Sequence, residues 1–301
     1  MAERIGIVGV GLMGSAFSHH LIESGFEVRG FDLDEKRMAQ LHERGGQPVE
    51  SPAAAADGAR WMLTSLPNSD IVREVVLGKN GIAEGAGRGL ILADATTARP
   101  QDSQALAAEL AQRGIRFLDA AVSGTSAMAW KKDLIVIAGG APEDFEACKP
   151  LFAGFSRAAY RMGDVGAGAM TKLIINLVLF GNRLALAEGL VLGMKSGMDC
   201  ESLLAVLQDG ACASKTMIDK GPKMLKGDYT PEGQVKISLK DGRLALEQGA
   251  RVGAPMLVAS LWTQLQQAAY QQGRADDDSV AFIEVLRLMA GLPARTRDPR
   301  A

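Results

Sequence analysis

Short apolar runs alternate with segments of helical periodicity through the first half of the chain. The runs are RIGIVGV, EVRGFD, WMLTSL, LILADA, RFLDAAVS and LIVIAGG, and enough residues separate each from the next for a crossover helix. Most of them are apolar throughout rather than alternating, which is typical of strands covered by helices on both faces. The pattern therefore predicts an α/β fold with a doubly wound parallel sheet.

The pattern of apolar positions changes after GDVGAGA at residues 163–169. Long segments with helical periodicity follow. The sequence therefore predicts an α/β domain at 1–164 and an all-helical domain at 165–292. A helix over about 168–195 would span roughly 40 Å, which is long enough to link the two. The last residues, 293–301, mix proline with charge and are expected to form a frayed tail.

Composition and charge narrow the range of partners. The 301 residues are 47% hydrophobic and carry a net charge of −2, so no basic field favours nucleic acid or an anionic membrane. The longest apolar stretch, LIINLVLFG at 173–181, is shorter than the ~20 residues of a membrane span. A strand-like run begins about four residues into the chain, which leaves no room for a signal peptide and favours the cytoplasm.

The spacing of cysteine and histidine predicts no metal site. Three cysteines lie far apart, which argues against a disulfide framework and against a cysteine zinc site. The three histidines, His19, His20 and His42, fall in the first two helical patterns, where we expect them to face solvent. No cluster at ligand spacing is therefore expected.

The stretch GVGLMG follows the first strand and opens a helical pattern. Gly9 permits the tight turn, Gly11 lets the backbone approach a pyrophosphate, and Gly14 lets the helix pack closely on the strand. Amide groups at the helix start, those of Leu12 and Met13 included, then face the anion. The arrangement predicts a dinucleotide site.

The second strand, EVRGFD, ends in Asp32, which lies 18 residues past Gly14. A carboxylate at that place accepts hydrogen bonds from a ribose hydroxyl and would repel the 2′-phosphate of NADP. We therefore expect NAD to be preferred. Lys36 and Arg37 lie just beyond and leave NADP possible, and an aspartate that only caps the next helix is the alternative.

Lys172 stands among small and apolar residues in the stretch GAGAMTKLIINL. The residues alone leave two interpretations open. The aliphatic stem can lie along apolar surface while its ammonium stays in water. Alternatively, partial desolvation lowers the pKa of the amine and prepares it for proton transfer.

The chain resembles the β-hydroxyacid dehydrogenases, a family that includes 3-hydroxyisobutyrate dehydrogenase and relatives of 6-phosphogluconate dehydrogenase. Six blocks carry the resemblance in the same order: GVGLMGSAF, SLPNSDIVREVV, DATTARP, DAAVSG, GAGAMTKLIIN and LKDGRLALEQGARVGAP. The family implies an N-terminal Rossmann domain joined by a long helix to an all-helical domain. It also implies hydride transfer between a nicotinamide and C3 of a small carboxylic acid, in a homodimer or homotetramer.

The resemblance assigns roles to residues of these blocks. Lys172 falls on the catalytic lysine, and Asn176, four residues on, lies on the same helix face and can bond the substrate hydroxyl or carboxylate. Ser123 and Gly124 fall on the anchor of the substrate carboxylate, with Thr125 beside them. The remaining cofactor-side positions are Leu66, Pro67, Thr97 and Lys240, the last of which precedes the acidic Asp241.

Three positions depart from the family pattern. Ala121 replaces a proline, Thr125 replaces the second glycine after the serine, and Ile175 replaces the first asparagine of a pair. Thr125 and Ile175 are expected to reshape the pocket around the distal end of the substrate. Hydroxyisobutyrate is therefore not the expected substrate. The 6-phosphogluconate branch has a much longer chain and a histidine where Ile175 stands, so 6-phosphogluconate is not expected either.

Two alternative functions remain. An imine reductase on a similar frame usually has another residue type at the lysine position. A non-catalytic dinucleotide-binding scaffold is expected to lose the lysine. The presence of Lys172, Ser123 and Asn176 together favours a 3-hydroxyacid dehydrogenase or semialdehyde reductase over both.

Overall fold

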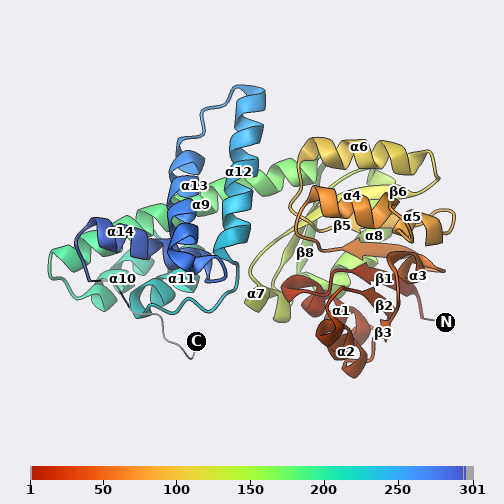
Figure 1. Cartoon of the computed structure of the whole chain (residues 1–301), viewed down its shortest axis with the longest axis horizontal. Helices are drawn as coiled ribbons and strands as arrows, with labels where there is room; N and C mark the ends of the chain where they lie inside the picture. The colour runs from red at the N-terminus through yellow and green to blue at the C-terminus, as the bar shows by residue number, and fades with distance from the viewer. Residues whose placement is uncertain (1, 294, 296–301) are drawn as a thin grey trace. The chain divides into compact units, whose positions relative to one another are not determined.

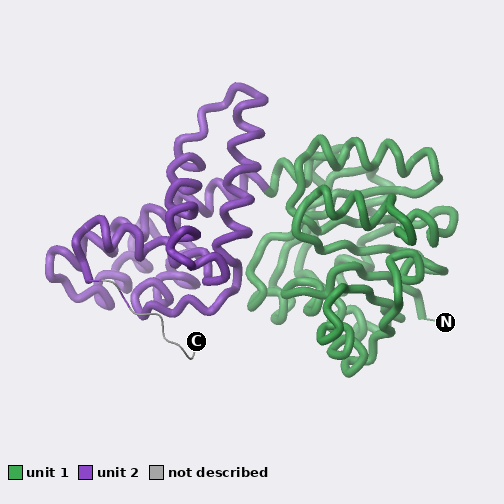
Figure 2. Tube along the Cα trace, viewed as in Figure 1, with its two compact units in different colours: residues 1–172 green, residues 173–301 purple. Residues whose placement is uncertain are grey.

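The computed structural model describes residues 2–293 and 295. The chain divides into two compact units, which are unit 1 at residues 1–172 and unit 2 at residues 173–301 (Figure 2). The tail expected at 293–301 lies outside the described residues except for residues 293 and 295. Each unit has its own hydrophobic core.

The described residues of unit 1 form one eight-stranded sheet with the order β3-β2-β1-β4-β5-β6-β7-β8. The first strand pairs in parallel with β2 on one side and β4 on the other, so the sheet is doubly wound, as predicted. The strands are β1 (Arg4–Val8), β2 (Glu27–Phe31), β3 (Gln47–Pro48), β4 (Trp61–Thr64), β5 (Ile91–Asp94), β6 (Arg116–Ser123), β7 (Ile135–Gly139) and β8 (Ala158–Gly163).

Helices cover both faces of this sheet (Figure 1). Ile7 of β1 packs in one cluster with Phe17 and Phe152, whereas its neighbour Val8 packs in another with Val72. Successive strand residues point to opposite faces, so a strand covered on both sides is apolar at every position. The helices of unit 1 are α1 (Leu12–Glu23), α2 (Glu35–Glu43), α3 (Pro52–Ala56), α4 (Ser69–Leu77), α5 (Ile82–Gly85), α6 (Pro100–Ala111), α7 (Ser126–Trp130) and α8 (Pro142–Phe155).

The strand β7 differs from the predicted parallel arrangement. It pairs with β6 in the antiparallel direction, with Ser123 opposite Ile135. Only residues 124–134 join the two strands, and they include the short helix α7. A parallel crossover needs a dozen or more residues. The prediction of a wholly parallel sheet is therefore wrong at this strand, and β8 then pairs in parallel with β7.

The sequence pattern does not predict the two strands at the edges of the sheet. One of them, β3, has two residues. The other, β8, has the sequence AAYRMG, in which Tyr160 and Met162 are exposed. A strand of mixed polarity at an edge lacks the apolar run by which the inner strands are found.

Unit 2 is helical in its described residues apart from an isolated bridge between Gln234 and Asp278. Phe180 and Trp262 stack in its core with ring centroids 4.6 Å apart. The helices are α9 (Ala167–Lys195), which begins in unit 1, α10 (Cys200–Asp209), α11 (Lys215–Lys226), α12 (Val235–Val252), α13 (Leu257–Ala269), the π-helical η1 (Tyr270–Arg274), the 3₁₀ helix η2 (Ser279–Phe282) and α14 (Ile283–Met289).

The long helix α9 is apolar enough to cross a membrane, judged by length and composition alone. Its side chains Leu184, Leu186 and Leu190 are instead buried in the core of unit 2. Core helices of water-soluble proteins meet the same length and composition criteria. Part of α9 therefore packs in the core of unit 2, and its length and composition are only weak evidence for a membrane span.

Candidate functional site

The loop between β1 and α1 has the backbone that its glycines predict. Gly9 has a φ of +91°, a conformation that favours glycine. A Cβ on Gly14 would lie 1.9 Å from the Gly9 carbonyl oxygen, so only glycine lets α1 start this close to β1. A Cβ on Gly11 would meet nothing nearer than the Arg37 side chain at 3.5 Å. The fold thus requires Gly9 and Gly14, whereas Gly11 leaves space beside the backbone.

The N-terminus of α1 is suited to an anionic ligand. Gly11 is the N-cap residue, and no side chain among the described residues caps the helix. The first N–H groups of a helix have no partner within it and carry a partial positive charge. These amides, which include those of Leu12 and Met13, therefore fit the pyrophosphate of a dinucleotide.

Asp32, directly after β2, holds this loop in shape. One of its carboxylate oxygens accepts the Val10 N–H at 2.9 Å, and the other accepts the Asp34 N–H at 3.0 Å. A carboxylate has about four acceptor sites, so two bonds to backbone leave capacity for ribose hydroxyls. The cap of α2 is Asp34, which accepts the Lys36 N–H, so Asp32 is not the helix cap. The Arg37 guanidinium lies 3.4 Å from the Asp32 carboxylate.

Hydrogen bonds join the loops that follow β4 and β5. The Leu66 N–H donates to the Thr96 hydroxyl at 3.0 Å. Asp94, at the end of β5, accepts the Thr64 hydroxyl at 2.8 Å and the Thr96 N–H at 3.0 Å. These bonds fix the segment that carries the predicted Thr97 and, on the other loop, Leu66 and Pro67. The sequence indicates Thr97, but the connection is made by its buried neighbour Thr96, which no motif marks.

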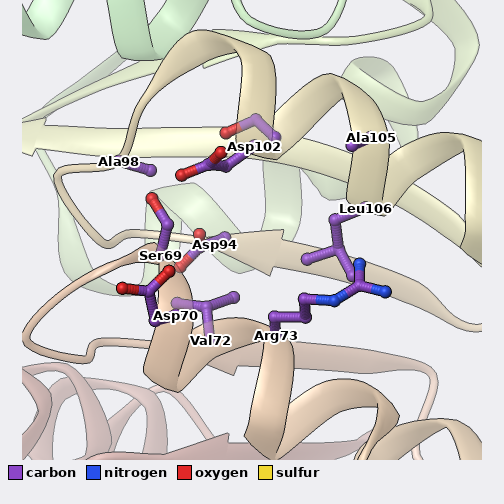
Figure 3. Close-up of a pocket in the computed structure, with 10 residues that line it drawn as sticks. Ser69, Asp70, Val72, Arg73, Asp94, Ala98, Asp102, Ala105 and Leu106 are labelled. Carbon is purple, nitrogen blue, oxygen red and sulfur yellow. The ribbon is translucent and has the colours of Figure 1, made fainter. Parts of the chain in front are cut away.

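A cavity of about 90 Å³ lies between α4 and α6 (Figure 3). Ser69, Asp70 and Asp102 contribute polar groups to its wall. It is far smaller than the ~300–1,000 Å³ of a usual ligand pocket. None of the residues predicted to contact cofactor or substrate lines it. We therefore assign this cavity no part in the site.

Asp119 of β6 fixes the start of α9. Its carboxylate accepts the Gly166 N–H at 2.8 Å and the Ala169 N–H at 2.6 Å. A Cβ on Gly168 would lie 2.5 Å from the Asp119 carbonyl oxygen, so glycine is required for this close approach. Burial raises the pKa of the Asp119 carboxyl to about 6, against the effect of the two N–H donors, which favour the ionised form. At neutral pH the carboxylate therefore accepts both bonds.

This anchor determines where Lys172 can stand. Lys172 follows Gly168 by four residues on α9 and is half-buried. The strand β6, to which Asp119 belongs, ends at Ser123. The helix that carries the lysine is thus fastened to the strand that carries the serine.

The turn after β6 is strongly constrained. Gly124 has a φ of +143°, and a Cβ there would lie 2.3 Å from the Leu134 side chain. Thr125 is the N-cap of α7, and its hydroxyl accepts the Met128 N–H at 3.3 Å. Thr125 therefore has a structural role in addition to the substrate-side position expected for it. Ser123 is half-buried and Gly124 is exposed.

In unit 2, a short polar chain holds Asn176. The side chain is 5% exposed, and its Nδ2 donates to an Asp241 carboxylate oxygen at 3.0 Å. The Lys240 ammonium lies 3.1 Å from the other oxygen of Asp241. The bond to Asp241 orients the Asn176 amide and leaves its Oδ1 as an acceptor for another group. Sequence analysis named Asp241 only as the neighbour of Lys240, because a contact across 65 residues leaves no local signal.

The structure thus gathers the predicted residues into local groups. One consists of the β1–α1 loop with Asp32, and a second consists of the β6 turn with the start of α9. The third is the chain formed by Asn176, Asp241 and Lys240. Lys172 and Asn176 lie one turn apart on α9, the first in unit 1 and the second in unit 2.

The histidines of α1 lie differently from what the sequence predicts, because three possible metal ligands are close together there. His19, His20 and Glu23 of α1 each place a ligand atom within 4.8 Å of the other two. The His20 side chain is only 12% exposed rather than solvent-facing. Its Nε2 lies 3.0 Å from the Ala129 carbonyl oxygen.

Two family descriptions together match most of the chain. Residues 4–163 match the NAD binding domain of 6-phosphogluconate dehydrogenase. Residues 166–286 match a family described as NAD-binding of NADP-dependent 3-hydroxyisobutyrate dehydrogenase.

Similar proteins are found among curated sequences and solved structures. The 2-(hydroxymethyl)glutarate dehydrogenase of Eubacterium barkeri is 31% identical over 290 residues, which cover 96% of each chain. A crystal structure of 3-hydroxyisobutyrate dehydrogenase from Salmonella typhimurium has a TM-score of 0.87 at 27% identity, covering 94% of this chain and 99% of that one. An imine reductase from Pseudomonas sp. has a TM-score of 0.64 at 17% identity, covering 95% and 100%, and this likeness concerns the fold alone.

Proposed function

Because the chain belongs to the β-hydroxyacid dehydrogenase family, we propose that it moves a hydride between a nicotinamide and C3 of a small carboxylate substrate, with Lys172 as general acid and base. It is an NAD(P)-dependent oxidoreductase of the hydroxyacid dehydrogenase type. The Asp119 anchor carries the proposal, because it fastens the helix of the half-buried Lys172 to the strand that ends at Ser123.

Each residue has a defined part in the proposed proton transfer. In the oxidative direction, the neutral Lys172 amine takes the proton of the substrate hydroxyl as the C–H bond at C3 breaks. In the reductive direction, the ammonium returns this proton to the carbonyl oxygen. The Asn176 amide, oriented by Asp241, holds the oxygen in place. A nicotinamide cofactor, which the β1–α1 loop and Asp32 would hold, would accept or supply the hydride.

The proposed substrate class is a small acid with its hydroxyl on the carbon β to a carboxylate. The named substrates 2-(hydroxymethyl)glutarate and 3-hydroxyisobutyrate both contain this unit. We expect Thr125 and Ile175 to select among such acids at the distal end. A cofactor-reduction screen across small 3-hydroxyacids, with NAD and NADP in parallel and the semialdehydes in the reverse direction, tests this. Absence of turnover with every member would contradict the proposed function.

We further propose that Ser123 and the Gly124 N–H anchor the substrate carboxylate. A hydrogen bond to a charged group contributes about 1.5–3 kcal/mol, so Ser123→Ala should raise KM roughly 10- to 100-fold. The turnover number should change less, because the contact exists in the ground state and the transition state alike. Steady-state kinetics of the variant measure both constants. The anchor is refuted if the methyl ester of the best acid reacts as well as the acid.

The cofactor that we propose is NAD, with NADP as the weaker alternative. Asp32→Ser should lower the ratio of kcat/KM for NAD to kcat/KM for NADP by about tenfold or more. The change removes repulsion of the 2′-phosphate and releases the Arg37 guanidinium. Asp34→Ser is the matched control, since Asp34 also lies 3.4 Å from Arg37 but caps α2. This control shows how much of the effect comes from releasing Arg37 and how much from losing the Asp32 carboxylate. The measurement is kcat/KM for both cofactors, and a native preference for NADP would contradict this interpretation of Asp32.

The other expectations from the sequence stay predictions. They are the cytoplasmic location, the homodimer or homotetramer, the domain boundary at residue 164 and the absence of nucleic-acid and membrane partners. Size-exclusion chromatography with light scattering measures the oligomer directly.

A further inference from the structure

We propose that His19, His20 and Glu23 form a binding site for a divalent transition metal, for which zinc has the best-fitting geometry. The Glu23 Oε2 atom lies 3.4 Å from His19 Nε2 and 3.7 Å from His20 Nδ1. All three ligand atoms lie within 4.8 Å of one another. In a tetrahedral zinc site with bonds of about 2.0–2.1 Å, neighbouring ligand atoms are about 3.3 Å apart. Small side-chain rotations would therefore bring the three atoms to coordination distance.

His20 is prepared as a ligand by its other ring nitrogen. Its Nε2 faces the Ala129 carbonyl oxygen at 3.0 Å. A carbonyl oxygen only accepts, so Nε2 is the nitrogen that donates to it, and Nδ1 is the nitrogen left for a metal. Metal-bound histidines usually donate their second N–H to a carbonyl or carboxylate in this way. Nδ1 and the Glu23 carboxylate face each other at 3.7 Å, and a metal cation between them would bind both.

The surroundings of the three ligands leave room for further ligands. Glu23 is 62% exposed, whereas His19 and His20 are 32% and 12% exposed. Two imidazoles and one carboxylate suit zinc, cobalt, nickel and copper rather than magnesium or calcium, which prefer oxygen ligands. Three protein ligands with an open fourth position are a common arrangement for zinc.

The site connects two elements that border the proposed active centre. The helix α1 begins at the dinucleotide loop, and α7 directly follows the turn of Ser123 and Gly124. The contact of His20 with Ala129 joins the far end of α1 to α7. A metal that fixes the His20 ring would therefore stabilise this contact within unit 1. It has no role in the proposed hydride transfer.

Trp130 provides an optical probe of the site. Its ring lies 5.3 Å from the His19 ring and is also contacted by the Arg44 guanidinium at 5.0 Å. A paramagnetic ion bound to His19 should quench this tryptophan. Cobalt(II) supplies both this quenching and visible absorption bands that report its ligands.

The test is a cobalt(II) titration of the full chain, free of affinity tags and treated with a chelator beforehand. We expect one cobalt per chain, visible absorption, quenching of Trp130 and displacement by zinc. Glu23→Gln and His20→Gln should each weaken binding about tenfold or more. His42→Gln, on α2, is the matched control and should leave binding unchanged. Trp130→Phe should remove the quenching and keep the absorption.

The variants are designed to remain folded, since Glu23 is exposed and glutamine at position 20 can still donate to Ala129. Circular dichroism checks this. Cobalt binding that is unchanged in both Glu23→Gln and His20→Gln would overturn the proposal, as would an absence of saturable binding to the native chain. Because no substrate is present, these outcomes are independent of the proposed function.

Discussion

Replacement of Lys172 by alanine is expected to lower turnover by about 10²–10⁴-fold or more, which is the usual contribution of a general acid or base. The half-buried amine stands on a helix whose start is fixed by Asp119, so the backbone sets the position of this proton donor and acceptor. Cofactor binding should be retained, because the glycine loop and Asp32 lie on other elements.

The arginine variant tests whether the side chain at position 172 acts by transferring a proton or by its positive charge alone. Lys172→Arg keeps a positive charge, but a guanidinium cannot give up its proton at accessible pH, so it should restore little activity. Lys195→Ala, at the exposed end of the same helix, is the matched control and should retain native turnover.

Fluorescence titration with NADH and steady-state rates together separate binding from chemistry. If Lys172→Ala keeps near-native turnover, the lysine is a residue whose stem covers apolar surface, which was the other interpretation of the sequence. Loss of NADH binding along with activity would point instead to damage of the nucleotide site.

The features that sequence predicts well are those with a local cause. Gly9 and Gly14 were assigned their roles from spacing alone, and the structure confirms a positive φ at the first and an absence of space for a Cβ at the second. The apolar periodicity placed α9 at about 168–195, and the helix is Ala167–Lys195. Inner strands were found because burial on both faces makes every position apolar.

Features that depend on distant contacts were not predicted. Asp119 meets Gly166 and Ala169 across 47 and 50 residues, and neither the strand nor the helix start indicates the pairing. The role of Asp241 depends in the same way on Asn176. The direction of β7 had a local signal that was overlooked, since a connection of residues 124–134 is too short for a parallel crossover.

The histidine cluster was missed for a different reason. His19, His20 and Glu23 occupy positions i, i+1 and i+4 of one helix, a spacing that is common on solvated helix faces. Only the fold shows that Ala129 approaches His20 from α7 and fixes which ring nitrogen is available. The ligand geometry is therefore tertiary even though the three residues are neighbours in sequence.

Removal of the buried ammonium in unit 2 is expected to cause the largest loss of stability. Lys220 of α11 is 2% exposed, and its Nζ donates to Asp278 at 2.9 Å and to Glu232 at 2.8 Å. Asp278 is fully buried and also accepts the N–H groups of Glu232 and Val280. Lys220→Met would remove the ammonium that pairs with this carboxylate, and breaking a buried ion pair typically costs about 3–5 kcal/mol.

Urea denaturation followed by circular dichroism should therefore show a lower free energy of unfolding for Lys220→Met. The matched control is Lys226→Met on the exposed end of α11, which should change stability by about 0.5 kcal/mol or less. In the double variant Lys220→Met with Asp278→Asn, the charge of Asp278 is gone as well, and the amide oxygen can still accept one of the two N–H groups, that of Glu232 or that of Val280. If the buried charge of Asp278 causes the loss, more than half of the lost free energy of unfolding should return. An equal loss in the single and double variants would instead assign the effect to packing of the lysine stem.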